Sequence, residues 1–323
     1  MRPALATGLM CIVAAVGATV FAADSIELPD WVYPMNPPDW KPPTDDGIPR
    51  RVPGSDVTYS LAQLTNVRSF TGPDWHPTSH TPMPAVVAQG RRPGVFPCSY
   101  CHRADGTGGP ENANLAGLPA AYIAQQMQDY RAGRRSTSVA KRGPTGNMIA
   151  VAKEITDDEI AAAAQYFSQL PRRSYIRVVE SARVPRTHVD NWILLPAGGG
   201  DEPIGNRVIE FPDNVERFEL RDSGMTFTAH VPPGSLARGE SLVKTGGNGL
   251  TVQCATCHGP ALQGTPLGPP LAGRSPNYLA RQLYDFKTGA RAGANAPQMH
   301  DVVARLSAAD IVSITGYVAS LPP

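Results

Sequence analysis

The chain has 323 residues, 41% of them apolar, which suits two packed domains and excludes a disordered coil. Its 29 basic and 28 acidic side chains nearly cancel, which argues against nucleic acid as a partner, because phosphate binding needs a basic excess. Four of the five cysteines lie in two Cys-x-x-Cys-His motifs, and the fifth, Cys11, lies in the predicted signal peptide, so none remains for a structural disulfide or a catalytic thiolate.

The N-terminus predicts export. Arg2 precedes a mostly apolar run that ends in small residues at Ala22 and Ala23. We therefore expect a cleavable signal peptide over residues 1–22 and a periplasmic protein, with an uncleaved membrane anchor as the alternative. No later segment approaches a spanning length, so the mature chain is expected to be soluble, with docking at a membrane surface left open.

A proline-rich arm is expected over residues 23–84. Residues 24 to 97 contain 14 prolines and three of the four tryptophans, a composition that predicts little regular structure. Trp31, Trp40 and Trp75 are large apolar surfaces that need burial, either within the chain or against a partner, and burial within the chain is favoured.

The two motifs predict covalent haem. Cys98-Ser-Tyr-Cys101-His102 and Cys254-Ala-Thr-Cys257-His258 each place two thiols where both vinyl groups of one porphyrin can react, beside a histidine that can bind the iron. The rivals are a zinc site and a thioredoxin-like redox pair. The 152 residues between Cys101 and Cys254 do not suit a compact zinc module, and no βαβ context accompanies either motif. We therefore predict two haem c groups.

An internal repeat surrounds the motifs. From each motif to the end of the helix expected after it, the two copies match at a constant offset of 156 residues. Beyond that helix the offset becomes 151, so the first copy has five extra residues in one loop. The matched pairs are Leu115/Leu271, Tyr122/Tyr278, Gln126/Gln282, Asp129/Asp285, Gly133/Gly289, Arg135/Arg291, Met148/Met299, Ile160/Ile311 and Leu170/Leu321. A duplicated domain explains these matches.

Helix signals recur in both copies. The first helix after each motif is expected to begin at Pro119 or Pro276 and to end at Gly133 or Gly289. Capping boxes start the last helices at Thr156 and Ser307, and a short amphipathic helix is expected ahead of the second motif, closed by two glycines. These signals predict a mainly α fold.

A small β-rich linker is expected over residues 172–233. The β-type runs are 175–179, 192–195, 207–211 and 217–220, split by glycine and proline turns. We expect these runs to form an antiparallel sheet that joins the two copies.

Both copies resemble class I cytochrome c domains, and the tandem is similar to c4-type dihaem cytochromes. The resemblance covers about residues 85–171 and 234–323. It implies that Met148 and Met299, placed in loops, supply the sixth iron ligand opposite His102 and His258. It also implies that a backbone carbonyl at Pro269, and at Ala113 in the first copy, orients each histidine.

Other ligands compete with the methionines. His300 adjoins Met299, but the first copy has isoleucine at that position. In the arm, His76, His80 and Met83 are three potential metal ligands within eight residues. A turn-rich loop with surface histidines is favoured there; competition of His76 or His80 for the first haem iron is the alternative hypothesis.

These features predict an electron carrier rather than an enzyme. Its partners would be periplasmic redox proteins: a dehydrogenase, or a membrane oxidase or reductase. The alternatives are a cytochrome subunit of a periplasmic dehydrogenase complex and a dihaem enzyme such as a peroxidase. Neither motif adjoins a nucleophile and base.

Overall fold

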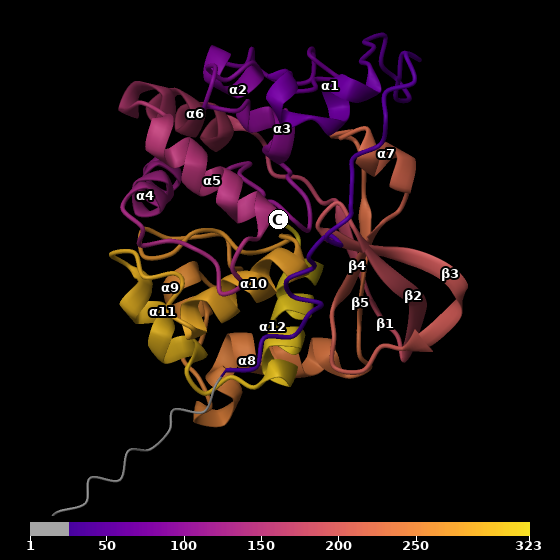
Figure 1. Ribbon diagram of the computed structural model, residues 1–323. Helices are drawn as coiled ribbons and strands as arrows, with labels where there is room; N and C mark the ends of the chain where they lie inside the picture. The colour runs from indigo at the N-terminus through magenta and orange to yellow at the C-terminus, as the bar shows by residue number, and fades with distance from the viewer. Residues whose placement is uncertain (1–25) are drawn as a thin grey trace, which may run out of the picture.

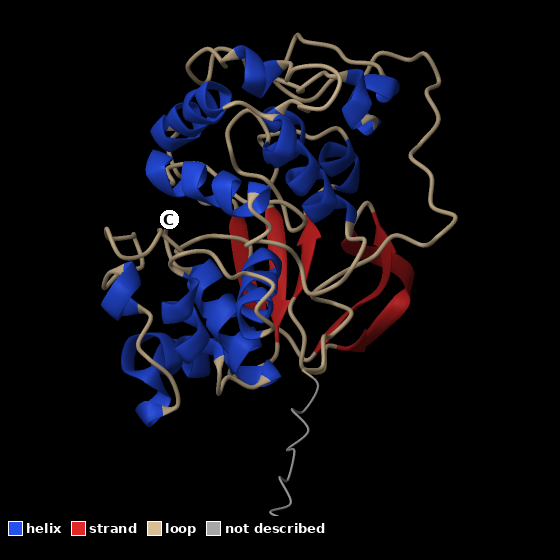
Figure 2. Cartoon of the chain, turned by 60° about the vertical axis from the view of Figure 1, so that its left-hand side comes forward, coloured by secondary structure: helices blue, strands red, loops and turns tan. Residues whose placement is uncertain are grey.

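The computed structural model describes residues 26–323, so the predicted signal peptide lies outside the described residues. Two helical domains are stacked on each other, and the strands gather along one side of the stack (Figure 1, Figure 2). We refer to residues 85–171 as the first repeat and to residues 234–323 as the second repeat.

The first repeat consists of four helices and a short lead helix. They are α2 (Ala85–Ala88), α3 (Cys98–His102), α4 (Ala120–Arg131), α5 (Gly143–Glu154) and α6 (Asp157–Gln169). The predicted capping box is present, because Thr156 accepts from the Glu159 backbone while the Glu159 side chain accepts from the Thr156 backbone. The apolar face of α6 is buried at Ile160, Ala163 and Phe167, which follow the three-and-four spacing of an amphipathic helix.

The second repeat has the same order of helices. They are α8 (Ser235–Gly249), α9 (Ala255–His258), α10 (Pro276–Lys287), α11 (Ala296–Val303) and α12 (Ala308–Ser320). Regular helix in α8 stops at Gly246 and Gly247, whose φ values of 70° and 57° are left-handed, as the two glycines predicted. At Gly239, α8 lies so close to α12 that an added Cβ would meet the Ser313 carbonyl oxygen at 2.1 Å.

Within residues 26–323 no single helix is long and apolar enough to cross a membrane. The bent pair of α11 and α12 passes the same test of length and composition, with an angle of 118° between its helices. Most of α12 is buried in the core of the second repeat.

The β-rich segment differs from the prediction in topology. Strands β1 (Ile176–Glu180), β5 (Phe227–Val231) and β4 (Ile209–Pro212) form one sheet in the order β1-β5-β4. In this sheet β1 pairs with β5 in parallel and β4 pairs with β5 antiparallel.

A separate antiparallel hairpin contains β2 (Arg183–Asp190) and β3 (Ile193–Pro203). The prediction of one fully antiparallel sheet was therefore wrong. The strand predicted at 217–220 was also wrong: helix α7 (Val215–Glu219) occupies this stretch, and Asn214 caps it by accepting from the Arg217 backbone.

The arm is ordered along both repeats, and little of it is regular. Its elements are α1 (Leu61–Thr65) and η1 (Val67–Ser69). Trp31 packs into the core of the second repeat, whereas Trp75 packs with Val52, Leu64 and Leu220 near the first. The indigo trace in Figure 1 accordingly runs the length of the molecule. Trp31 and Trp75 are buried and Trp40 is half-buried, so the preference for burial within the chain is confirmed.

Candidate haem sites

Each motif folds into one helical turn that directs its histidine inward. His102 and His258 are only 7% and 8% exposed. The Nδ1 of His102 lies 2.8 Å from the Ala113 carbonyl oxygen, and that of His258 lies 2.7 Å from the Pro269 carbonyl oxygen. Because a carbonyl can only accept, Nδ1 carries the proton and Nε2 keeps its lone pair for a metal. The predicted orienting carbonyls are confirmed in both repeats.

Three of the motif cysteines are unsuited to a redox thiolate. Burial raises the pKa of Cys98 to about 12 and the pKa of Cys101 and Cys254 to about 11. A redox dithiol needs an accessible thiolate, whereas a thioether to porphyrin is neutral and tolerates burial. Within residues 26–323 no cluster of three His, Cys, Asp or Glu side chains is arranged to hold a metal ion. The neutral thioether is therefore the better fit.

One cavity brings the two sites together. A cavity of about 660 Å³ extends between the repeats and is lined by His102 and Met148 of the first repeat and by His258 and Met299 of the second. A smaller cavity of about 70 Å³ continues it beside Cys98 and Cys101. All four residues predicted as iron ligands therefore line the same cavity.

The methionines do not lie in loops as predicted. Met148 is in α5 and Met299 is in α11, and each of these helices has a proline in its first turn. Both methionines still line the cavity, as do His102 and His258. The prediction of loops was wrong because Pro144 and Pro297 are helix-starting residues, a signal that the sequence contained.

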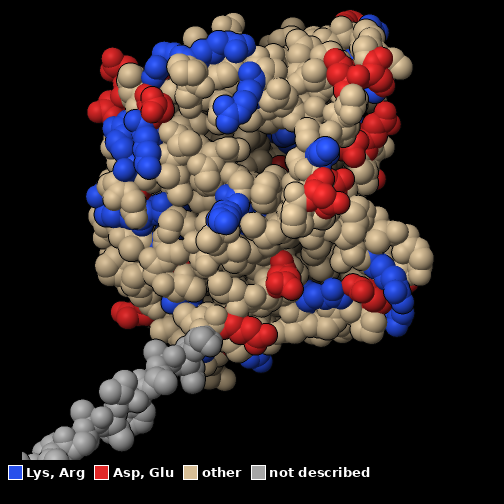
Figure 3. Space-filling view, viewed as in Figure 1, with Lys and Arg blue, Asp and Glu red and all other residues tan. Residues whose placement is uncertain are grey.

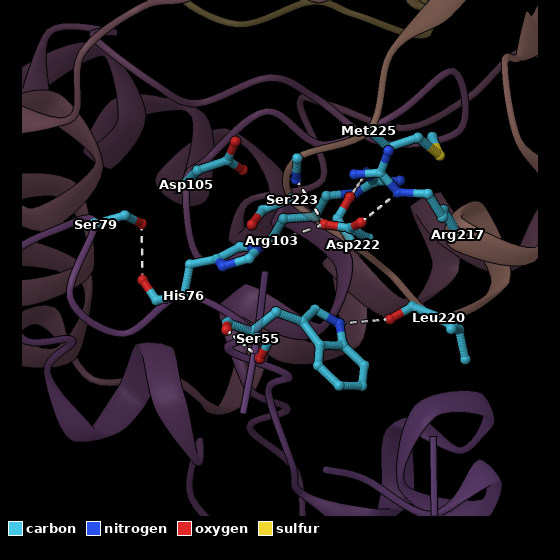
Figure 4. A network of polar contacts seen from close by, with 12 residues as sticks. Ser55, His76, Ser79, Arg103, Asp105, Arg217, Leu220, Asp222, Ser223 and Met225 are labelled. Carbon is cyan, nitrogen blue, oxygen red and sulfur yellow. Dashed lines mark hydrogen bonds and ion pairs between the residues drawn. The ribbon is translucent and has the colours of Figure 1, made fainter. Parts of the chain in front are cut away.

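The rival histidines are occupied elsewhere. His80 bonds to Asp74 through Nε2 at 3.0 Å, and His76 lies 3.9 Å from the Asp222 carboxylate (Figure 4). Neither histidine lines the cavity, and neither does His300, whose Nε2 is 3.4 Å from the Arg291 carbonyl oxygen. The geometry therefore favours the methionines over these histidines as cavity ligands.

A reciprocal network joins the two repeats at the cavity. Arg135 of the first repeat donates to Tyr278 at 3.0 Å and to Gln282 at 2.9 Å in the second repeat. In return, the second repeat's Arg291 donates to Tyr122 at 2.6 Å and to Gln126 at 2.8 Å in the first. Each of these residues pairs with its counterpart at the offset of 156, so the junction has approximate twofold symmetry. The repeat was visible in the sequence, but the exchange of partners was not.

The charges on the cavity wall fit a cofactor that carries carboxylates. Arg135 and Arg291 are 7% and 9% exposed, and both line the cavity. Neither takes part in an ion pair among the described residues. A buried guanidinium group costs several kcal/mol when no anion balances its charge, and the propionates of a haem would supply that anion.

The model of the cytochrome c family matches residues 94–171 and 236–322, which together make up just over half of the chain. The chain belongs to the cytochrome c family. With two motifs it is a tandem dihaem cytochrome that transfers electrons and contains two covalently bound haem c groups.

Two curated relatives extend over most of this cytochrome. Cytochrome c4 of Azotobacter vinelandii is 27% identical over 75% of this chain and 91% of its own length. A thiosulfate dehydrogenase electron acceptor of Stutzerimonas stutzeri is 24% identical over 72% of this chain and 82% of its own length. The c4-type resemblance inferred from the repeats is confirmed.

A solved structure of similar fold is longer than this chain. It is the thiosulfate dehydrogenase of Marichromatium purpuratum in its as-isolated form, with a TM-score of 0.50 and 29% identity. The match covers 74% of this cytochrome but 39% of that chain.

Proposed function

We propose that this cytochrome relays electrons between periplasmic redox proteins through two irons, each ligated by one histidine and one methionine. The observation that carries the proposal is that His102, Met148, His258 and Met299 line one continuous cavity. Bound haem would supply the one-electron chemistry of its iron. The chain would supply the ligands, the burial and the path between the two sites.

The role of each histidine follows from its second nitrogen. The carbonyl oxygens of Ala113 and Pro269 hold the Nδ1 protons, and burial lowers the pKa of both His102 and His258. Each imidazole therefore stays neutral at physiological pH and offers Nε2 to iron. Met148 and Met299 would each add a thioether ligand, which would favour ferrous iron and raise the potential, as suits a carrier.

A dehydrogenase is the donor that the relatives favour. Two of the similar proteins are named electron acceptors of thiosulfate dehydrogenase. By analogy, this cytochrome would take electrons from a periplasmic dehydrogenase and pass them to a membrane oxidase or reductase.

A second candidate is a stable subunit of a dehydrogenase complex. The similar thiosulfate dehydrogenase structure favours it, since this chain matches 39% of a longer polypeptide. Co-purification in a fixed ratio with a dehydrogenase would distinguish the subunit from the free carrier.

A reductive titration followed optically tests the relay. The haem-loaded protein should accept two electrons per chain, one at each motif, and should bind cyanide slowly because no coordination position is open. Rapid cyanide binding or turnover of peroxide would instead identify a dihaem enzyme. Reduction by purified thiosulfate dehydrogenase with thiosulfate then tests the proposed donor.

A further inference from the structure

The two motifs differ sharply in how far their outer edges are covered. Six residues lie within or close to each motif at matched positions. We call these two sets the first rim and the second rim. The first rim is Phe96, Tyr100, Ala104, Thr107, Pro110 and Glu111. The second rim, 156 residues later, is Val252, Thr256, Pro260, Gln263, Pro266 and Leu267. All six residues of the second rim are exposed, whereas every residue of the first rim is buried or half-buried.

The segments outside the repeats cover the first rim. From the β-rich segment, the Arg221 guanidinium lies 3.9 Å from the centre of the Tyr100 ring, and its Nη1 donates to the Tyr100 carbonyl oxygen at 3.1 Å. From the arm, Phe70 packs against Phe96 with ring centres 5.8 Å apart, and the Arg68 guanidinium lies over the Phe96 ring.

Below this contact a polar network fixes the β-rich segment to the first motif. Arg103, which follows His102, donates to the Asp222 carbonyl oxygen at 2.6 Å. The buried Asp222 carboxylate in turn accepts from Arg217 at 2.6 Å. Figure 4 shows this network. The Trp75 indole donates to the carbonyl oxygen of the neighbouring Leu220 at 2.8 Å. The first rim is therefore covered by the arm and the β-rich segment, which both lie outside the two repeats.

The second rim is open where the cavity reaches the surface. Val252 and Leu267 are 47% and 64% exposed, two of the four large apolar side chains that are exposed in residues 26–323. Both also line the cavity, together with Cys254, Cys257 and His258. An edge of the cofactor held by the second motif would thus lie beside an uncovered apolar surface.

The second rim is also free of charge. Residues 245–273 contain no Asp, Glu, Lys or Arg. Arg305 donates to the Gly249 carbonyl oxygen of this segment, and the buried Arg274 donates to the Pro270 carbonyl oxygen. Figure 3 agrees, since the surface over α9 and α11 is mostly uncharged, whereas basic side chains gather over α2. A partner that matches the second rim would present an equally uncharged, apolar face.

We propose that the second rim is the docking surface through which this cytochrome exchanges electrons with a redox protein whose own contact face is apolar and uncharged. The inference rests on the proposed electron relay and adds which of the two haem sites meets the redox partner. Electrons both enter and leave at the second motif, and the covered first motif exchanges them with the second through the cavity. Docking at an uncharged rim also predicts association rates that depend little on ionic strength.

Surface accessibility is the first test and needs no electron transfer. A neutral nitroxide added to the haem-loaded protein broadens the NMR signals of amides that it can approach. Relative to a diamagnetic analogue, we expect selective broadening at residues 252–267 and protection at residues 96–111. Equal or stronger broadening at the first rim would overturn the inference.

Electron exchange is the second test, with photochemically produced flavin mononucleotide semiquinone as an anionic reductant. Leu267→Glu adds one negative charge to the second rim, and the matched control Arg68→Gln removes one positive charge beside the first. We expect Leu267→Glu to slow the bimolecular reduction about fourfold at low salt, with the wild-type rate restored at high salt. Arg68→Gln should leave the rate unchanged.

The outcomes separate the two proposals. Slowing by Arg68→Gln but not by Leu267→Glu, or by neither variant, overturns the second rim as the docking surface. A wild-type protein in which either haem stays oxidised after photoreduction contradicts the relay itself.

Discussion

The two repeats contain the same haem motif and orient its histidine in the same way, yet their surroundings differ. Around the first motif the β-rich segment supplies Arg221 over Tyr100 and Asp222 against Arg103, and Trp75 of the arm bonds to Leu220 beside them. Around the second motif the same face is bare. Duplication thus preserved the chemistry inside each domain, while the added segments made the two sites unequal toward the outside.

The largest expected effect comes from removing the cover of the first motif. Trp75 is 1% exposed and packs edge-on against Tyr59, with ring centres 4.8 Å apart. Trp75→Ala should lower the free energy of unfolding by about 3–5 kcal/mol, measured by urea denaturation of the haem-loaded protein. It should also expose the first rim to the nitroxide.

Trp40→Ala provides the control for this prediction. Trp40 is half-buried and donates to Asp190 at 2.5 Å, so its loss should cost only about 1 kcal/mol. Equal losses for the two variants would show that Trp75 has no special part in the cover.

A buried carboxyl distinguishes the helix that follows the second motif. Glu210 of β4 accepts from Ser275 at 2.6 Å at the start of α10, while its Oε1 has no hydrogen-bond partner among the described residues. The start of α4 in the first repeat has no side-chain cap. Burial raises the pKa of Glu210 from 4.5 to about 7.

This shift makes stability depend on pH. The folded state holds the proton more tightly, so the stabilisation is complete below pH 4.5 and is lost as the pH rises to about 7. Glu210→Gln removes the titration, and its stability relative to wild type should rise by about 3 kcal/mol over that window. Urea denaturation at several pH values measures this difference; a constant difference would contradict the assignment.

The smallest effect is expected where the repeats are most alike. Thr156 and Ser307 cap α6 and α12 with the same reciprocal bonds. Thr156→Ala and Ser307→Ala should each lower the free energy of unfolding by about 1 kcal/mol, as judged by urea denaturation. A loss at one cap only would show that the added segments reach these helices too.

Local features were readable from the sequence, and long-range ones were not. The motifs, the capping boxes and the glycines that end α8 each act within a few residues, so sequence spacing was enough. The parallel pairing of β1 with β5 joins Ile176 to Phe227, and no local pattern encodes such a pairing. The same holds for Arg221 over Tyr100, which are brought together only by the tertiary fold.

The hydrogen bonds that Arg135 and Arg291 make between the repeats were partly predictable from the sequence. Their equivalence was evident from the repeat, but their partners depend on how the two domains stack. The methionines show a further case, because the repeat identified Met148 and Met299 as equivalent while their helical setting was missed.

The most direct test of the account is the weak far-red absorption band that ferric haem shows when sulfur is its ligand. The oxidised protein should show two such contributions, and Met148→Ala and Met299→Ala should each remove one. The control Met127→Leu, which also alters a methionine at the cavity, should retain both. If both single variants keep the full band, methionine ligation at the two sites is contradicted.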